Sequence, residues 1–136
     1  MFLNNNKNIL VGDPRLDLEH QQILSTLERL QEPIVSKTLR IATCEKLLHY
    51  INQHVVDEEA IMRLYNVPNM EEHFQEHINL QEHFISLLGT FIKNGGSINY
   101  KVKEAFIHHI EIYDINMIGH IRKQKELDAN NIEMGF

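Results

Sequence analysis

Two pairs of candidate metal ligands, each spaced four residues apart, constrain this chain more than any other feature. His54 and Glu58 form the first pair, and His73 and His77 form the second. Residues four apart lie one turn above each other on the same face of a helix. Both pairs are in phase with an apolar stripe, so their side chains are expected to point into a core. Burying imidazoles and a carboxylate there costs roughly several kcal/mol unless they are paired or bind a metal.

Helical periodicity, interrupted by strong breakers, predicts four helices. Asp13 can cap the free amides of the first helix, and Pro14 is tolerated in its first turn. Asn94-Gly95-Gly96-Ser97 is a strong stop for the third helix, and Gly119 is expected to end or kink the fourth. The expected helices cover residues 13–32, 38–65, 70–93 and 98–118.

Helices of this length joined by short loops must alternate in direction. The expected fold class is therefore all-α, an up-down-up-down four-helix bundle. We expect a single domain over residues 1–136, divided into an extended N-terminal arm (1–12), the bundle (13–118) and a short C-terminal helical tail (119–136).

Composition and charge narrow the class of protein further. With 43% hydrophobic and 24% charged residues the chain is typical of soluble globular proteins, and its net charge of −6 argues against a nucleic-acid or anionic-membrane partner. The single Cys44 cannot form an internal disulfide, which fits a reducing compartment. The N-terminus does not resemble a signal peptide, and no stretch approaches the ~20 apolar residues of a membrane span. We expect a cytoplasmic protein.

The first and fourth helices add three more candidate ligands. His20 falls on the apolar stripe of the first helix, and His109 and Asp114 flank that of the fourth. His109 is preferred over His108, because His108 shares its face with charged residues. In a regular helix five residues are about 500° of turn, or about 140° net, so His109 and Asp114 are expected to straddle the inward face. The complete predicted set is His20, His54, Glu58, His73, His77, His109 and Asp114.

Five imidazoles and two carboxylates are too many for one ion. Two ions are needed, with Glu58 and Asp114 bridging them. Five His bonds, four carboxylate bonds and two bonds from an oxo or hydroxo bridge fill eleven of the twelve positions of two six-coordinate ions, so one position stays open for a small ligand. Octahedral preference and mixed nitrogen and oxygen ligation favour iron over tetrahedral zinc.

The order and spacing of these residues resemble the hemerythrins, in particular the single-domain bacteriohemerythrins. The matching motifs are Asp17-Leu-Glu-His20-Gln, His54-x3-Glu58-Glu59, His73-x3-His77 and His109-Ile-x3-Asp114. The resemblance covers residues 10 to about 120. The resemblance implies reversible O2 binding at a non-haem di-iron centre. It also implies that residues like His73, His77 and His109 hold one iron, and that residues like His20 and His54 hold the other, which keeps the open position.

The chain departs from this family in the residues that line the O2 pocket. Many relatives carry Trp one turn before the fourth-helix His, where this chain has Ala105, and Phe directly after the second-helix His, where it has Val55. A wider pocket is expected unless Phe106 or another side chain fills the gap. Val55, Ala105 and Phe106 are thus the predicted pocket lining, with O2 and small anions as ligands.

Two other functions remain open. A widened pocket would also suit a di-iron enzyme or an NO- or peroxide-handling protein, although oxygen-activating sites of the ferritin-like class are richer in carboxylates. Alternatively, the same residues bind zinc or nothing in a structural protein. The remaining histidines, His49, His83, His108 and His120, are expected at the surface. The sequence favours a carrier, store or sensor rather than an enzyme, as a monomer or small homo-oligomer, and it leaves any protein partner unknown.

Overall fold

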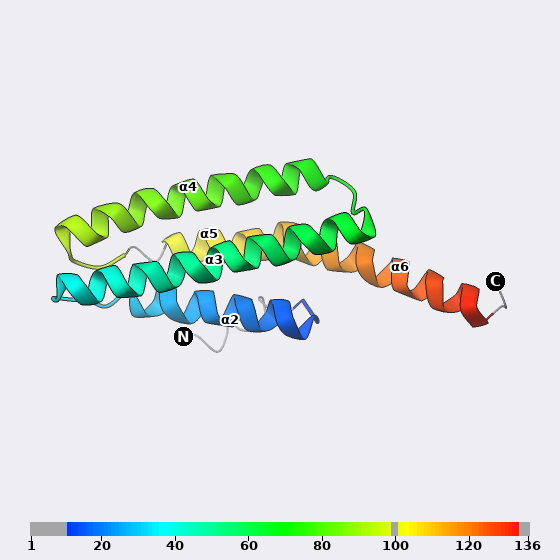
Figure 1. The fold of residues 1–136 in the computed structure, drawn as a ribbon, viewed down its shortest axis with the longest axis horizontal. Helices are drawn as coiled ribbons and strands as arrows, with labels where there is room; N and C mark the ends of the chain where they lie inside the picture. The colour runs from blue at the N-terminus through cyan, green and yellow to red at the C-terminus, as the bar shows by residue number, and fades with distance from the viewer. Residues whose placement is uncertain (1–10, 99–100, 134–136) are drawn as a thin grey trace.

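The computed structural model describes residues 11–98 and 101–133, and every regular element in these ranges is helical (Figure 1). This confirms the all-α class. The predictions for residues 1–10 and 134–136 lie outside the described residues. The elements are α2 (Pro14–Arg29), α3 (Lys37–Tyr65), α4 (Met70–Asn94), α5 (Lys101–His109), the π-helix η1 (Ile110–Asp114) and α6 (Ile115–Glu133).

Local capping explains where α2 and α3 begin and where α4 ends. The Asp13 carboxylate accepts hydrogen bonds from the amides of Arg15 and Leu16 at the start of α2, as the sequence predicts. Ser36 accepts one from the amide of Leu39 at the start of α3. At the end of α4, Gly95 has a φ of 74°, a conformation that favours glycine, so the predicted stop is confirmed.

The helices pack side by side as a helical bundle. Helix α2 contacts α3 and α5, and α4 also contacts α3 and α5, so the four surround a common interior (Figure 1). Helix α6 continues past the end of the bundle. None of the described helices is long and apolar enough to span a membrane.

The irregular segment of the fourth helix is not at Gly119, where the sequence predicts an end or a kink. Gly119 does not end the helix, because α6 runs without interruption from Ile115 to Glu133. The irregular segment lies instead between His109 and Ile115, where five residues adopt a π-helix. Ile121, in the predicted tail, is still a core residue at 4% exposure, so the packed interior continues beyond the expected boundary at residue 118.

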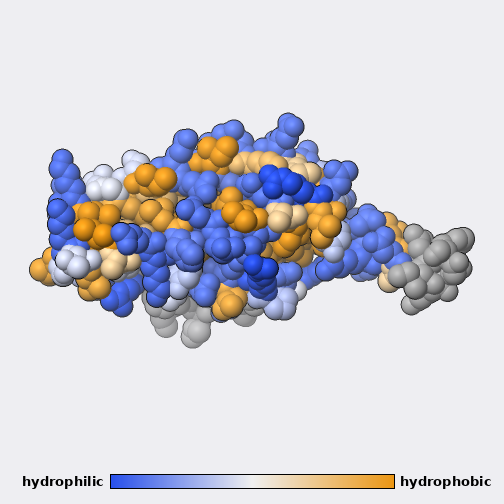
Figure 2. All heavy atoms as spheres, viewed as in Figure 1, coloured by the Kyte–Doolittle hydropathy of each residue, from blue (hydrophilic) through white to orange (hydrophobic). Residues whose placement is uncertain are grey.

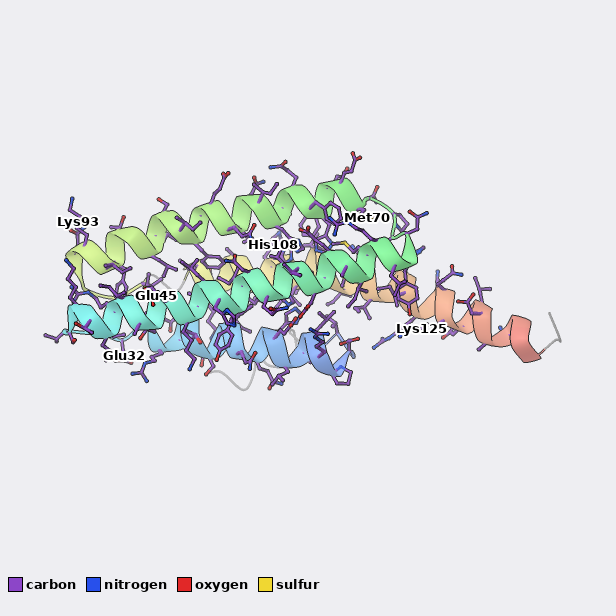
Figure 3. All side chains as sticks on the ribbon, in the orientation of Figure 1. Glu32, Glu45, Met70, Lys93, His108 and Lys125 are labelled. Carbon is purple, nitrogen blue, oxygen red and sulfur yellow. The ribbon has the colours of Figure 1, made fainter. Side chains whose placement is uncertain are left out.

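The interior is apolar at one end of the bundle and polar where the candidate ligands gather. Phe84, Leu47 and Leu27 are almost completely buried among aliphatic neighbours. Hydrophilic residues predominate on the face in Figure 2, with small groups of hydrophobic residues between them. Lys93 on α4 and Lys125 on α6 extend into solvent, as the side-chain view shows (Figure 3). The charged residues thus lie mainly outside, and the candidate ligands make up most of the exceptions.

Candidate metal centre

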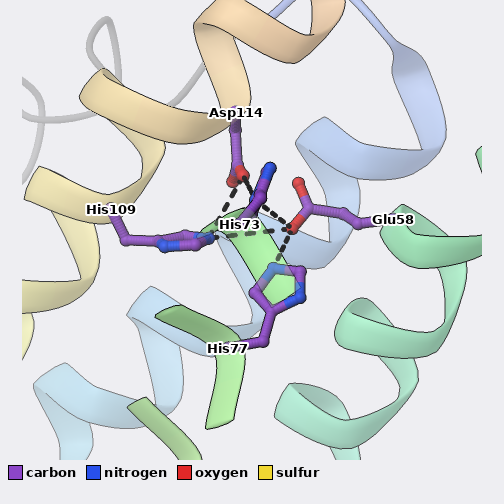
Figure 4. Close-up of side chains that lie close together, drawn as sticks. All are labelled: Glu58, His73, His77, His109 and Asp114. Atoms are coloured by element: carbon purple, nitrogen blue, oxygen red, sulfur yellow. Dashed lines mark hydrogen bonds and ion pairs between the residues drawn. The ribbon is translucent and has the colours of Figure 1, made fainter. Parts of the chain in front are cut away.

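The structure brings all seven predicted ligands together in two buried groups that could each hold a metal ion. Within a group, one candidate donor atom from each residue lies within 4.8 Å of all the others. Glu58 and Asp114 belong to both groups, as expected for carboxylates placed between two ions. The five-donor group is Glu58, His73, His77, His109 and Asp114 (Figure 4), and the four-donor group is His20, His54, Glu58 and Asp114.

Asp114 faces the two groups with different oxygens. Its Oδ2 lies 3.0 Å from His20 Nε2, whereas its Oδ1 lies 3.1 Å from His73 Nε2 and 3.2 Å from His109 Nε2. Asp114 is completely buried. A carboxylate with one oxygen toward each group has the arrangement that a bridge between two cations requires.

Glu58 occupies the other side of the cluster and contacts imidazoles of both groups. Its Oε1 lies 2.9 Å from His77 Nε2 and 3.2 Å from His54 Nε2. Its second oxygen, Oε2, is buried and accepts no hydrogen bond within the described part of the chain. Together with Asp114, it leaves the centre lined by carboxylate oxygens and Nε2 atoms.

The π-helix explains how the fourth helix contributes two ligands five residues apart. The expectation that His109 and Asp114 straddle the inward face assumed regular α-helical turns, and it is wrong for this segment. The wider turns of η1 rotate the chain less per residue, so that Asp114 comes back toward the side of His109. His109 Nε2 and Asp114 Oδ1 are consequently only 3.2 Å apart.

Several inward-facing atoms have no hydrogen bond in the described part of the chain, although carboxylate oxygens lie close to the two nitrogens among them, and a metal ion would supply a direct partner. His54 Nε2, His109 Nε2 and Glu58 Oε2 are buried and without a hydrogen bond among the described residues. An unsatisfied buried polar atom costs about 1–3 kcal/mol. Nitrogen and carboxylate donors that point at a common centre match the ligand preferences of iron and zinc. The residues therefore fit a metal site.

Without a metal, the cluster balances its charge by protonating imidazoles. Burial lowers the pKa of His109, but the Asp114 and Glu58 carboxylates outweigh burial and raise it to about 9. Burial also lowers the pKa of His54, yet Glu58, Asp114 and Glu19 hold it well above its usual value. Two imidazolium groups thus face two buried carboxylates.

The carboxylates respond in the opposite direction. Burial and the neighbouring Asp114 both raise the pKa of Glu58, but the charge of His54 and the close approach of the His109 and His54 rings bring it down to about 2. Burial likewise raises the pKa of Asp114, and contacts with His109, His20 and His54 lower it well below the usual value. Both carboxylates are therefore ionised at neutral pH and available to a cation.

Two further carboxylates, which the sequence reasoning missed, lie behind the ligands. Glu19 Oε1 accepts a hydrogen bond of 3.0 Å from His54 Nδ1, and Glu59 Oε2 accepts one of 2.8 Å from His77 Nδ1. Glu19 directly precedes His20 in the sequence, and Glu59 directly follows Glu58. Neither glutamate lies on the apolar face of the helix that carries its neighbour. Only the packing of neighbouring helices shows which imidazole each one reaches.

Phe106 lies against the four-donor group. Its ring centroid is 6.0 Å from that of His20 and 6.1 Å from that of His54, and it is 2% exposed. Val55 and Ala105 are half-buried, and Val55 packs against the core. Phe106 therefore borders two imidazoles of the four-donor group, and the role of all three residues as an O2-pocket lining stays a prediction.

A surface cavity of about 380 Å³ reaches the five-donor group from the end of the bundle. His73 and Tyr113 form part of its wall, and His120 lies there as well. The Tyr113 ring stacks on that of His109, with centroids 5.3 Å apart. His120 is accordingly half-buried, whereas His49, His83 and His108 are exposed as predicted.

No protein-family model, curated protein or solved structure matched this chain in the comparisons.

Proposed function

We propose that this protein binds O2 reversibly at a non-haem di-iron centre in a hemerythrin-like, up-down-up-down bundle. The observation that carries the proposal is the pair of donor groups that share Glu58 and Asp114. One group offers five donors and the other four, and this difference supports an open coordination position at the four-donor group. A ferrous pair held by the two groups would supply the two electrons that O2 takes up on binding.

The protein residues have three tasks in this proposal. Glu58 and Asp114 bring two negative charges to the centre and offset the repulsion between two cations. Five imidazoles hold the metals through neutral donors, which favours the ferrous state over that of a carboxylate-rich site. Phe106, packed against His20 and His54, limits the access of water and anions to the four-donor group. These tasks suit binding and release better than turnover.

A di-iron enzyme, or a protein that handles NO or peroxide, is the second candidate. The cavity beside His73 and Tyr113 favours it, because about 380 Å³ is more space than a diatomic gas needs. Under this alternative a larger substrate enters from the α3–α4 end of the bundle. Steady consumption of O2 in the presence of a reductant would distinguish turnover from binding.

The test of the proposal combines metal content with absorption spectroscopy. Protein made with ample iron is expected to contain two irons per chain. After anaerobic reduction, exposure to air should produce a visible absorption band that disappears under argon and returns with O2. Colourless protein, zinc as the retained metal, or a single iron per chain would contradict the proposal. His49→Ala, which changes an exposed histidine on α3, serves as the control.

A further inference from the structure

Each donor group has one imidazole that is connected to the surface through a carboxylate and an arginine. In the Glu19 triad, defined as Arg15, Glu19 and His54, the Arg15 Nε atom lies 3.9 Å from Glu19 Oε2, and Glu19 Oε1 accepts from His54 Nδ1. His54 belongs to the four-donor group. The exposed guanidinium thus compensates the charge of a carboxylate that contacts a candidate ligand.

The Glu59 triad, defined as Arg63, Glu59 and His77, repeats this arrangement at the other group. Arg63 Nη2 lies 3.6 Å from Glu59 Oε1, and Glu59 Oε2 accepts from His77 Nδ1. His77 belongs to the five-donor group. In both triads the arginine and the glutamate are four residues apart on one helix, and the imidazole comes from a neighbouring helix.

These hydrogen bonds decide which ring nitrogen is free to bind a metal. A carboxylate can only accept, so Nδ1 of His54 and of His77 must carry the proton. When a metal takes the place of the proton on Nε2, that nitrogen would present its lone pair to the centre, and the Nε2 atoms of both residues face Glu58 there. A negatively charged acceptor behind the ring also makes the imidazole a stronger donor.

We propose that Glu19 and Glu59 are positioning residues, one for each metal, that fix the tautomers of His54 and His77 and set the affinities of the four-donor and five-donor groups separately. The inference rests on the proposed di-metal function. It assigns to each carboxylate one metal and one imidazole, so the effects of changing them should be separable.

The two triads differ in their surroundings. Glu19 is 8% exposed, and its partner Arg15 also lies 3.0 Å from Asp57, which accepts a hydrogen bond from Gln53. Glu59 is half-buried. The Glu19 triad is therefore held by a larger polar network, and replacing Glu19 should disturb its imidazole more than replacing Glu59 disturbs His77.

The first experiment reads the tautomers directly in zinc-loaded protein with nitrogen-15 in its histidines. In the unchanged protein, His54 and His77 should both show a proton on Nδ1. Glu19→Gln should keep this tautomer at His54, because the amide oxygen still accepts, whereas Glu19→Leu should lose it and leave His77 unchanged. The reciprocal result is expected for Glu59→Gln and Glu59→Leu. Unchanged tautomers in both Leu variants would overturn the proposal.

The second experiment separates the two affinities by adding Co²⁺ to metal-free protein. The five-donor group should fill first and the four-donor group second. Glu59→Leu should weaken the first step, and Glu19→Leu should weaken the second, each about 10- to 100-fold. The Gln variants should lose less. Equal weakening of both steps by either Leu variant, or no weakening, contradicts the assignment of one carboxylate to each metal.

Matched controls use carboxylates on the same helices for which the described part of the chain shows no contact with an imidazole. Glu28 on α2 pairs with Lys103 at 2.8 Å, so Glu28→Gln tests the loss of a partly buried ion pair away from the cluster. Glu45 on α3 is exposed, so Glu45→Leu controls for an apolar replacement on that helix. Neither should change a tautomer or a Co²⁺ affinity. Because neither readout involves O2 or iron, tautomers and affinities that follow Glu19 and Glu59 would stand even if O2 binding failed.

Discussion

At the scale of single residues, two adjacent histidines on the fourth helix have opposite environments. His109 is 1% exposed and contacts Asp114, whereas His108 is exposed. His109→Ala should therefore remove a ligand and lower the bound iron below two per chain, while His108→Ala should leave the iron content and visible spectrum unchanged. Elemental analysis of both purified variants checks this. Equal iron content in the two would mean that His109 is no ligand.

Phe106 should control how quickly air oxidises the iron. It packs against His20 and His54, so Phe106→Leu shortens a side chain that shields the four-donor group. We expect the ferric form to accumulate several-fold faster in this variant. Ala105→Trp, which adds bulk one turn before His109, should slow the same process. The measurement is the decay of the air-exposed visible spectrum.

Ile107→Val on the same helix, at a half-buried position, provides the comparison for this prediction. It should leave the decay rate unchanged. Equal decay rates in Phe106→Leu, Ala105→Trp and the unchanged protein, all folded and with full iron content, would show that the residues before His109 do not shield the centre.

At the scale of secondary structure, the π-helix allows His109 and Asp114, five residues apart, to point toward the same inward side. In a regular α-helix, residues four apart differ by about 40° and residues six apart by about 240°. Deleting Ile112, which is 45% exposed, should let an ordinary turn bring His109 and Asp114 to one side, and the variant should still bind metal. Inserting one alanine after Ile112 should place Asp114 on the wrong side and abolish the bridge.

The measurement for this pair of variants is Co²⁺ stoichiometry, with circular dichroism to verify that the helices are intact. The deletion variant is expected to bind at least one Co²⁺ per chain, and the insertion variant is expected not to bind the second Co²⁺. If the deletion loses all metal while the insertion keeps both, the wider turn of η1 is not what positions Asp114. Ile112→Ala controls for the loss of this side chain.

At the scale of the whole molecule, stability should depend on the metal. Removing it leaves His54 Nε2, His109 Nε2 and Glu58 Oε2 without partners in the interior. Ion pairs inside the cluster compensate in part, so the metal-free protein should stay helical. Its melting temperature should nevertheless be lower by on the order of 10 °C, because roughly several kcal/mol of stability are lost and each kcal/mol lowers the melting temperature by a few degrees. Thermal unfolding with and without chelator tests this. An unchanged midpoint would show that these residues hold no metal.

This difference in stability should also increase with pH. In metal-free protein the pKa of His109 is raised from 6.5 to about 9, so its stabilisation is complete below pH 6.5 and is lost as the pH rises through 9. The pKa of Glu58 is lowered from 4.5 to about 2, so its contribution is present above pH 4.5 and is lost as the pH falls toward 2. Metal-loaded protein needs neutral imidazoles and gains affinity with rising pH.

Between pH 6.5 and pH 9, the gap between the melting temperatures of loaded and metal-free protein should therefore widen. The loss of the His109 contribution alone is worth on the order of 3 kcal/mol. Melting curves at several pH values in this window provide the measurement. A gap that narrows with pH would contradict the pKa direction assigned to His109.

The sequence by itself determined the helices and most of the candidate site. The pairs His54/Glu58 and His73/His77 could be recognised because helical period is a local property, and Asp13, Asn94 and Gly95 mark helix ends through local hydrogen bonds and backbone conformation. The tertiary structure decided what depends on distant segments. It showed that Asp114 faces both groups with separate oxygens, and that a π-helix corrects the angle calculated for a regular turn.

The positions of Glu19 and Glu59 behind the candidate ligands also became visible only in the tertiary structure. Glu19 and His54 are 35 positions apart, and Glu59 and His77 are 18 apart. No local period relates residues on different helices, because their contact depends on how the helices are rotated and shifted against each other. That packing is fixed by the whole core at once. The sequence therefore identified the candidate ligands, and the fold alone decided which carboxylates contact them from behind.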